Sequence, residues 1–240
     1  GTVYLALKGE SFDGDIFCKD AIDNGSIAVI TDNPETLGRF ILVKDTYDAL
    51  LKIASHHHKE VNPRTIAITG SNGKTTVKEM MGKVLDSKKT IITKSNENNQ
   101  FGIPYTILRC TSSTENLVLE CGARHDGDFQ KIAEYFSFDQ LVITNINNSH
   151  VGIFKSIENI IRTKLELAKA VKKSGNVIEA AFKNLSKNHK LLKESNEIKL
   201  YDSNDLNLNT AWFYKCEKDS DQNDQYQISL NSKNADRQIK

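Results

Sequence analysis

One short segment carries the residue types that phosphate chemistry needs. The apolar run from Thr65 to Thr69 breaks into a turn bracketed by Gly70 and Gly73, and the turn ends in Lys74 and Thr75. Glycines let backbone amides approach phosphate oxygens, a lysine brings a point charge, and a threonine hydroxyl can hold magnesium. The segment therefore predicts a nucleotide-binding loop formed by Gly70, Ser71, Asn72, Gly73, Lys74, Thr75 and Thr76.

The spacing of this loop departs from the general motif. Only two residues separate Gly70 from the Gly73-Lys74 pair, where the general pattern has four. A plain glycine turn with a solvated lysine is the alternative. The context argues against it, because apolar residues at helical spacing follow the loop, namely Val77, Met80, Met81, Val84 and Leu85. We expect strand, loop and buried helix in the order that phosphate binding requires.

Further polar residues follow the predicted strands at 116–120 and 140–144. Glu120 ends the first strand, and a segment ending in His150 follows the second. Ligands of parallel sheets bind at the carboxyl ends of the strands, so both side chains can reach a metal directly or through water. Taken singly, each also fits a helix cap or a solvated surface group.

Lys164 interrupts an apolar helical stripe. Steps of three and four residues from Ile157 give Ile161, Lys164, Ala168 and Val171. A lysine at such a position either snorkels to water or has a function, and the residues alone favour snorkelling.

Strands and helix-length segments alternate along the chain, which indicates an α/β fold. The first unit has strands near 3–7, 27–30 and 40–43 and helices near 18–24 and 46–59, and Pro63 marks its end. The second has strands at 65–69, 89–93, 116–120, 140–144 and 176–179. We predict a small amino-terminal α/β domain at 1–62, then a P-loop-type central domain at 63–240 with a mostly parallel sheet and helices on both faces.

Composition limits the class of protein. The 240 residues include 32 Lys and Arg against 31 Asp and Glu, so we expect neither nucleic acid nor a membrane as partner. The four cysteines form no C-x-x-C pair or zinc spacing, and we find no membrane-spanning run or signal peptide. We predict a cytoplasmic protein with buried thiols. His56-His57-His58 is expected to be a solvated helix end, because adjacent helical residues diverge.

Several segments, in order, resemble the Mur ligase family of peptidoglycan synthesis. The loop from Thr69 to Thr76 is similar to that family's own shortened phosphate loop, which accounts for the spacing. Asn96–Pro104, Glu120–Asp128 and Ile143–His150 are most similar to the member that adds D-alanyl-D-alanine. The opening Leu5–Gly14, with Phe17, resembles the family's uridine-nucleotide domain. The resemblance runs from residue 1 to about 175.

The resemblance implies roles for single residues. Lys74 would contact the transferred phosphate of ATP, Thr75 and Glu120 would bind magnesium, and His150 would hold a second magnesium. Lys164 matches a carbamylated lysine, whose anion would bind metal or orient phosphate. Lys74, Lys164 and His150 are thus the implied catalytic residues, the implied metal ligands are Thr75, Glu120, His150 and Lys164, and Asn98, Asn99 and His125 would lie near the substrate.

The implied reaction is ATP-driven amide formation through an acyl phosphate. It would join D-alanyl-D-alanine to UDP-N-acetylmuramoyl-tripeptide, in a monomer. The chain is expected to be a fragment that lacks the family's carboxyl-terminal domain. Two alternatives stay open: the sibling ligase that adds the third amino acid, and a nucleotide-binding module without turnover. The module is consistent with Val177–Phe182, which differs from the family's usual segment there.

Overall fold

The fold is described from a computed structural model, which describes residues 1–9, 12–36, 38–123, 125–146, 154–179, 199–202, 212–218 and 226–232. The chain divides into two compact units, Gly1–Leu200 and Tyr201–Lys240. In the second unit β12 (Trp212–Lys218) pairs antiparallel with β13 (Tyr226–Ser232). No described helix is long and apolar enough to cross a membrane.

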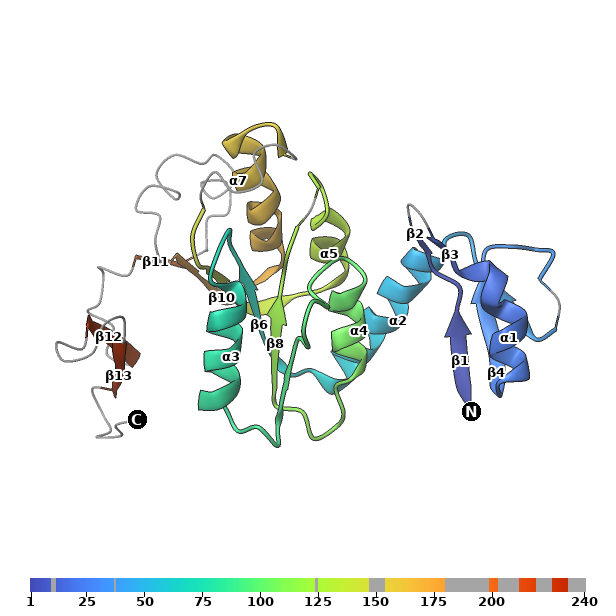
Figure 1. The fold of residues 1–240 in the computed structure, drawn as a ribbon, viewed down its shortest axis with the longest axis horizontal. Coiled ribbons are helices and arrows are strands. Elements are labelled where there is room, and N and C mark those ends of the chain that lie inside the picture. Colours follow the sequence, from blue (N-terminus) through green and yellow to red (C-terminus); the bar gives the residue numbers. More distant parts are fainter. Residues whose placement is uncertain are drawn as a thin grey trace. The chain divides into compact units, whose positions relative to one another are not determined.

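The amino-terminal part of the first unit is a small parallel sheet. Its strands β1 (Thr2–Leu5), β4 (Ser26–Thr31) and β5 (Phe40–Leu42) lie in the order β1-β4-β5 (Figure 1). The short strands β2 (Lys8–Gly9) and β3 (Phe12–Asp13) pair beside it, and the 3-10 turn η1 (Gly14–Phe17) leads into α1 (Cys18–Asp23). Ala6, Cys18 and Val29 form its core. The expected strands and first helix are confirmed.

The central sheet has the order β11-β10-β9-β6-β8-β7. The strands are β6 (Arg64–Thr69), β7 (Thr90–Ile92), β8 (Asn116–Glu120), β9 (Phe138–Ile143), β10 (Val171–Glu179) and β11 (Lys199–Asp202). From β10 to β7 every neighbouring pair is parallel. Because β6 lies between β9 and β8, the carboxyl ends of three neighbouring strands meet around the residues that follow β6.

Helices cover both faces of this sheet, as predicted (Figure 1). On one face α3 (Lys74–Val84) packs through Val77 and Met81 against Ile66, Ile68 and Val118. On the other face lie α2 (Thr46–Val61), α4 (Gly102–Leu108), α5 (Gln130–Tyr135) and α7 (Ile157–Glu166), over a core that includes Ala67, Leu117, Leu119, Leu141 and Ile143. Alternate residues of each strand therefore serve opposite layers. Val84, expected to be buried, is 46% exposed.

Helix α2 packs on the central sheet, although the predicted boundary at residue 62 assigns its sequence to the first domain. Its N-cap is Asp45, and its C-cap Asn62 is in the left-handed region, just before Pro63. Its buried side chains Leu51, Ala54, Ser55 and His58 recur at helical spacing, and the Ser55 hydroxyl donates to the Tyr135 carbonyl at 2.7 Å. The boundary itself stays a prediction.

His58 does not lie at a solvated helix end, and that expectation is wrong. The side chain is 6% exposed, and Nε2 lies 2.7 Å from Thr65 Oγ1. Since the Thr65 hydroxyl donates to the Pro63 carbonyl, His58 Nε2 is the donor in this pair. Burial lowers the pKa of His58 to about 4. His58 is a neutral core histidine.

Candidate nucleotide-binding site

The loop after β6 has a conformation that only glycine adopts easily. Gly70 has φ of 147° and Gly73 has φ of 79°, both in the region that L side chains avoid. A Cβ on Gly70 would lie 1.9 Å from Thr144 Oγ1. Gly73 is the N-cap of α3 and no side chain caps this helix end. The first amides of α3 are therefore available to an anionic ligand.

Two residues after β9 brace the loop. Asn145 Oδ1 accepts from the Asn72 amide at 3.0 Å, and Asn145 Nδ2 donates to the Asn72 carbonyl at 3.0 Å. The Thr144 hydroxyl donates to the same carbonyl at 2.6 Å, and the Ser71 amide donates to the Asn145 carbonyl at 2.8 Å. No role for Thr144 or Asn145 was predicted from the residues alone. Their signal was their position, directly after the strand that neighbours β6.

Lys74 and Lys164 meet at one backbone carbonyl. The Gly70 carbonyl accepts from Lys74 Nζ at 2.8 Å and from Lys164 Nζ at 3.2 Å. Lys164 is 6% exposed, so the snorkelling alternative is wrong. Burial, together with the charge of Lys74, lowers the pKa of Lys164 to about 8. Burial also lowers the pKa of Lys74, although the negative charge of Glu120 partly raises it again. Two cations thus lie close together beside the loop.

Glu120 is a buried carboxylate whose two oxygens have different surroundings. It is 2% exposed, and Oε1 accepts from the Thr75 hydroxyl at 3.1 Å and from Asn98 Nδ2 at 2.8 Å. Oε2 is buried and accepts no hydrogen bond from the described residues. Lys78 Nζ lies 3.7 Å from it. An orphaned carboxylate oxygen is unusual in a protein interior and is expected where an ion binds.

These oxygens fit a magnesium ion. Magnesium prefers oxygen ligands and is commonly held by one or two carboxylates plus substrate phosphates and water. Glu120 and the Thr75 hydroxyl supply such oxygens next to the loop. The described part of the chain has no cluster of three or more His, Cys, Asp or Glu side chains for a metal. Phosphates and water would therefore supply the remaining ligands.

The remaining predicted residues lie in varied surroundings. Asn98 contacts Glu120, whereas Asn99 Oδ1 accepts from the amides of Phe101 and Gly102 at 3.1 and 2.9 Å and so shapes the start of α4. The His125 side chain is 59% exposed, with its backbone amide bonded to Asp128. Thr76 is exposed on α3, and His150 lies outside the described residues.

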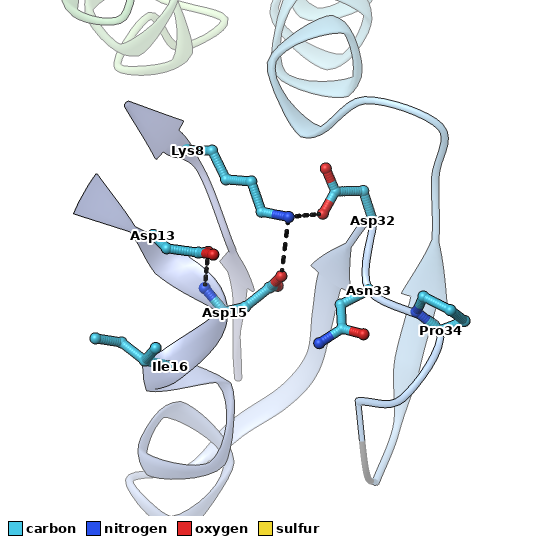
Figure 2. A pocket seen from close by; sticks show the side chains of 7 residues that line it. All are labelled: Lys8, Asp13, Asp15, Ile16, Asp32, Asn33 and Pro34. Carbon is cyan, nitrogen blue, oxygen red and sulfur yellow. Dashed lines mark hydrogen bonds and ion pairs between the residues drawn. The ribbon is translucent and has the colours of Figure 1, made fainter. Parts of the chain in front are cut away.

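A separate pocket of about 480 Å³ lies in the amino-terminal part (Figure 2). Lys8 Nζ reaches between two carboxylates, 2.6 Å from Asp32 and 3.2 Å from Asp15. These hydrogen bonds raise the pKa of Lys8. The pocket is lined by Lys8, Asp13, Asp15, Ile16, Asp32, Asn33 and Pro34.

The site combines a parallel sheet, a glycine loop that leads into a helix, and a buried carboxylate at the end of the neighbouring strand. These features define a P-loop-type nucleotide-binding domain. A family model narrows this class. The model described as the Mur ligase middle domain matches residues 68–240, and the chain belongs to the Mur ligase family.

Similar proteins of known sequence agree with this family assignment. The chain is 39% identical over 181 residues to the UDP-N-acetylmuramoyl-tripeptide--D-alanyl-D-alanine ligase of Bacillus subtilis, covering 73% of this chain and 40% of that protein. It is 34% identical over 195 residues to the ligase of the same name from Haemophilus influenzae, covering 78% and 42%. The chain thus spans about two fifths of the length of these relatives.

Solved structures of similar proteins agree with the family assignment as well. MurF ligase from Thermotoga maritima, in complex with ADP, superposes with a TM-score of 0.74 at 29% identity, over 84% of this chain and 47% of that one. MurF from Acinetobacter baumannii gives a TM-score of 0.76 at 30% identity, over 83% and 44%.

Proposed function

We propose that this chain is the nucleotide-binding part of an ATP-dependent amide ligase. The substrates are UDP-N-acetylmuramoyl-tripeptide and D-alanyl-D-alanine, and the reaction proceeds through an acyl phosphate in the cytoplasm. One observation carries the proposal: Glu120 and Lys164 come from two distant segments, and both contact the loop that holds Gly70, Lys74 and Thr75. The names of the relatives support the choice of substrates.

The loop and its lysines suit the handling of a triphosphate. The amides at the start of α3 offer donors to phosphate oxygens, and Lys74 is released from the Gly70 carbonyl when an anion competes for it. A carboxylate is a weak electrophile, and phosphorylation by ATP converts it to an acyl phosphate that an amine can attack. Positioning and charge stabilisation suffice for this step, so no side-chain nucleophile is needed. Bound magnesium would neutralise phosphate charge.

Lys164 is suited to carbamate formation. Only a neutral amine reacts with carbon dioxide, and the pKa of about 8 leaves a fraction of Lys164 neutral near physiological pH. Its buried place beside the Gly70 carbonyl supports a role at the phosphates. His150 as a second metal ligand, and Asn99 and His125 as substrate contacts, stay predictions.

The amino-terminal pocket suits the uridine end of the precursor. Three aspartates line it against one lysine, and Lys8 already pairs with two of them. A diphosphate would meet repulsion there, whereas ribose hydroxyls and the uracil N–H are donors that carboxylates accept. We propose that the pocket holds the nucleoside.

Two measurements test the proposal. The first is calorimetry of ADP binding to this chain with magnesium and with a chelator, where we expect binding that magnesium strengthens. The second is ADP release by a version extended to the full length of the relatives. Release with the tripeptide nucleotide plus D-alanyl-D-alanine supports the proposed ligase. Release with the dipeptide nucleotide plus a diamino acid supports the sibling, and binding without any release supports a module without turnover.

A further inference from the structure

Lys78 is a buried cation to which the phosphate loop gives no role. It lies on α3 one turn after Lys74, and its side chain is 1% exposed. Burial of an ammonium costs several kcal/mol unless a partner compensates. An apolar side chain at this buried position would avoid that cost. The partners of Lys78 therefore indicate why a charge is present.

Two carboxylates lie near the Lys78 ammonium. Nζ lies 3.0 Å from Glu79 Oε1 and 3.7 Å from Glu120 Oε2. The Glu79 side chain is 56% exposed, so water screens that pair. Glu120 is 2% exposed, and its Oε2 accepts no hydrogen bond from the described residues. Within the protein interior, Lys78 provides positive charge to this oxygen of Glu120.

We propose that Lys78 is the counter-ion of Glu120 and a positioning residue that sets the affinity of the site for a divalent cation. The inference rests on the proposed function, in which Glu120 faces magnesium. A metal held by Oε2 would draw on the same oxygen as Lys78, so the ammonium holds Glu120 in place while it disfavours a free cation. Bound phosphates add negative charge to the site, so that binding of the cation becomes favourable. The metal therefore enters with the nucleotide rather than ahead of it.

The test is a titration of the chain with Mn²⁺, which shares the oxygen preference of magnesium and is followed by electron paramagnetic resonance. Lys78→Met keeps a long unbranched side chain and removes the charge. We expect this variant to bind Mn²⁺ without nucleotide about tenfold more tightly than the wild type. A tenfold change in affinity is only part of the full interaction energy of two charges about 4 Å apart. A packing role alone predicts unchanged affinity. Equal or weaker Mn²⁺ binding by a folded Lys78→Met chain overturns the inference.

A second variant keeps the test independent of the folding of Lys78→Met. Glu79→Gln alters an exposed side chain and leaves Lys78 more available to Glu120. We expect weaker nucleotide-free Mn²⁺ binding. In the Lys78→Met background the same change is expected to have no effect. If Glu79→Gln weakens Mn²⁺ binding equally in both backgrounds, the cause is the lost charge of Glu79 itself. That result would refute the inference that Lys78 mediates the effect.

The wild type with ADP separates this inference from the proposed function. A wild-type chain that binds no Mn²⁺–ADP refutes both. A wild type that binds Mn²⁺–ADP, beside a Lys78→Met chain of unchanged Mn²⁺ affinity, refutes the role of Lys78 alone. In Glu120→Gln, the substitution Lys78→Met is expected to change nothing, because the shared oxygen no longer carries charge.

Discussion

Lys164→Met is expected to stabilise the fold at neutral pH while it removes a functional group. In the folded chain Lys164 is 6% exposed and near Lys74, and its pKa is lowered from 10.5 to about 8. Below pH 8 the lysine is protonated in both folded and unfolded chains, and the folded state bears the full cost of the buried charge. Between pH 8 and 10.5 only the unfolded chain retains the proton, so stability rises with pH.

The size of the effect follows from the change in pKa. A drop from 10.5 to about 8 corresponds to about 3 kcal/mol of unfolding free energy. Methionine also loses the hydrogen bond from Nζ to the Gly70 carbonyl, which is worth about 1 kcal/mol. The expected net gain for Lys164→Met is therefore about 2 kcal/mol at pH 7. The gain is expected to shrink as the pH approaches 10.

Urea unfolding followed by circular dichroism at pH 7 and pH 9.5, in buffers free of carbon dioxide, measures this gain. Lys169→Met is the matched control, because Lys169 lies five residues after Lys164 and is exposed, and we expect a change within about 0.5 kcal/mol. A loss of stability at pH 7 in Lys164→Met, with the control unchanged, would show that the protein holds the Lys164 ammonium favourably. That result would refute the reasoning.

Three further predictions concern the loop, the metal and the core. Gly70→Ala is expected to cost about 3 kcal/mol by thermal unfolding, because its Cβ meets Thr144 Oγ1, whereas Gly127→Ala, with positive φ but open space, is expected to cost about 1 kcal/mol. Glu120→Gln is expected to weaken magnesium-dependent ADP binding at least about tenfold, because even changes to residues that only contact metal ligands cause such a loss. Calorimetry with a chelator is expected to show unchanged metal-free binding. Stability is expected to fall by about 3 kcal/mol as the pH drops from 6.5 to 4, because the unfolded chain then protonates His58 more readily than the fold does; His58→Phe should flatten this dependence, and a parallel curve would contradict the assignment.

The sequence predicted the loop and its strands well because local chemistry dictates both. Gly70 and Gly73 report backbone conformation directly, and the apolar runs report the strands. Lys78 escaped notice because its neighbours Val77 and Met81 dominate the pattern of α3, and its partner Glu120 lies 42 residues away along the chain. His58 was misjudged as one of three adjacent histidines, although Leu51, Ala54 and Ser55 set the buried face to which it belongs. Pairings between distant segments carry no local signal.

The register of the central sheet links core packing to the site. Glu120 pairs with Ile68 across β8 and β6, and it shares its side of the sheet with Val118, which packs under α3. Because side chains alternate along a strand, a slip of β8 by one residue would turn Glu120 toward the opposite helices and away from Thr75. The apolar contacts of Val118 therefore do more than stabilise the fold. They determine which face of the sheet the Glu120 side chain points to. Glu120, the only buried carboxylate among the described residues, thereby lies at the phosphate loop.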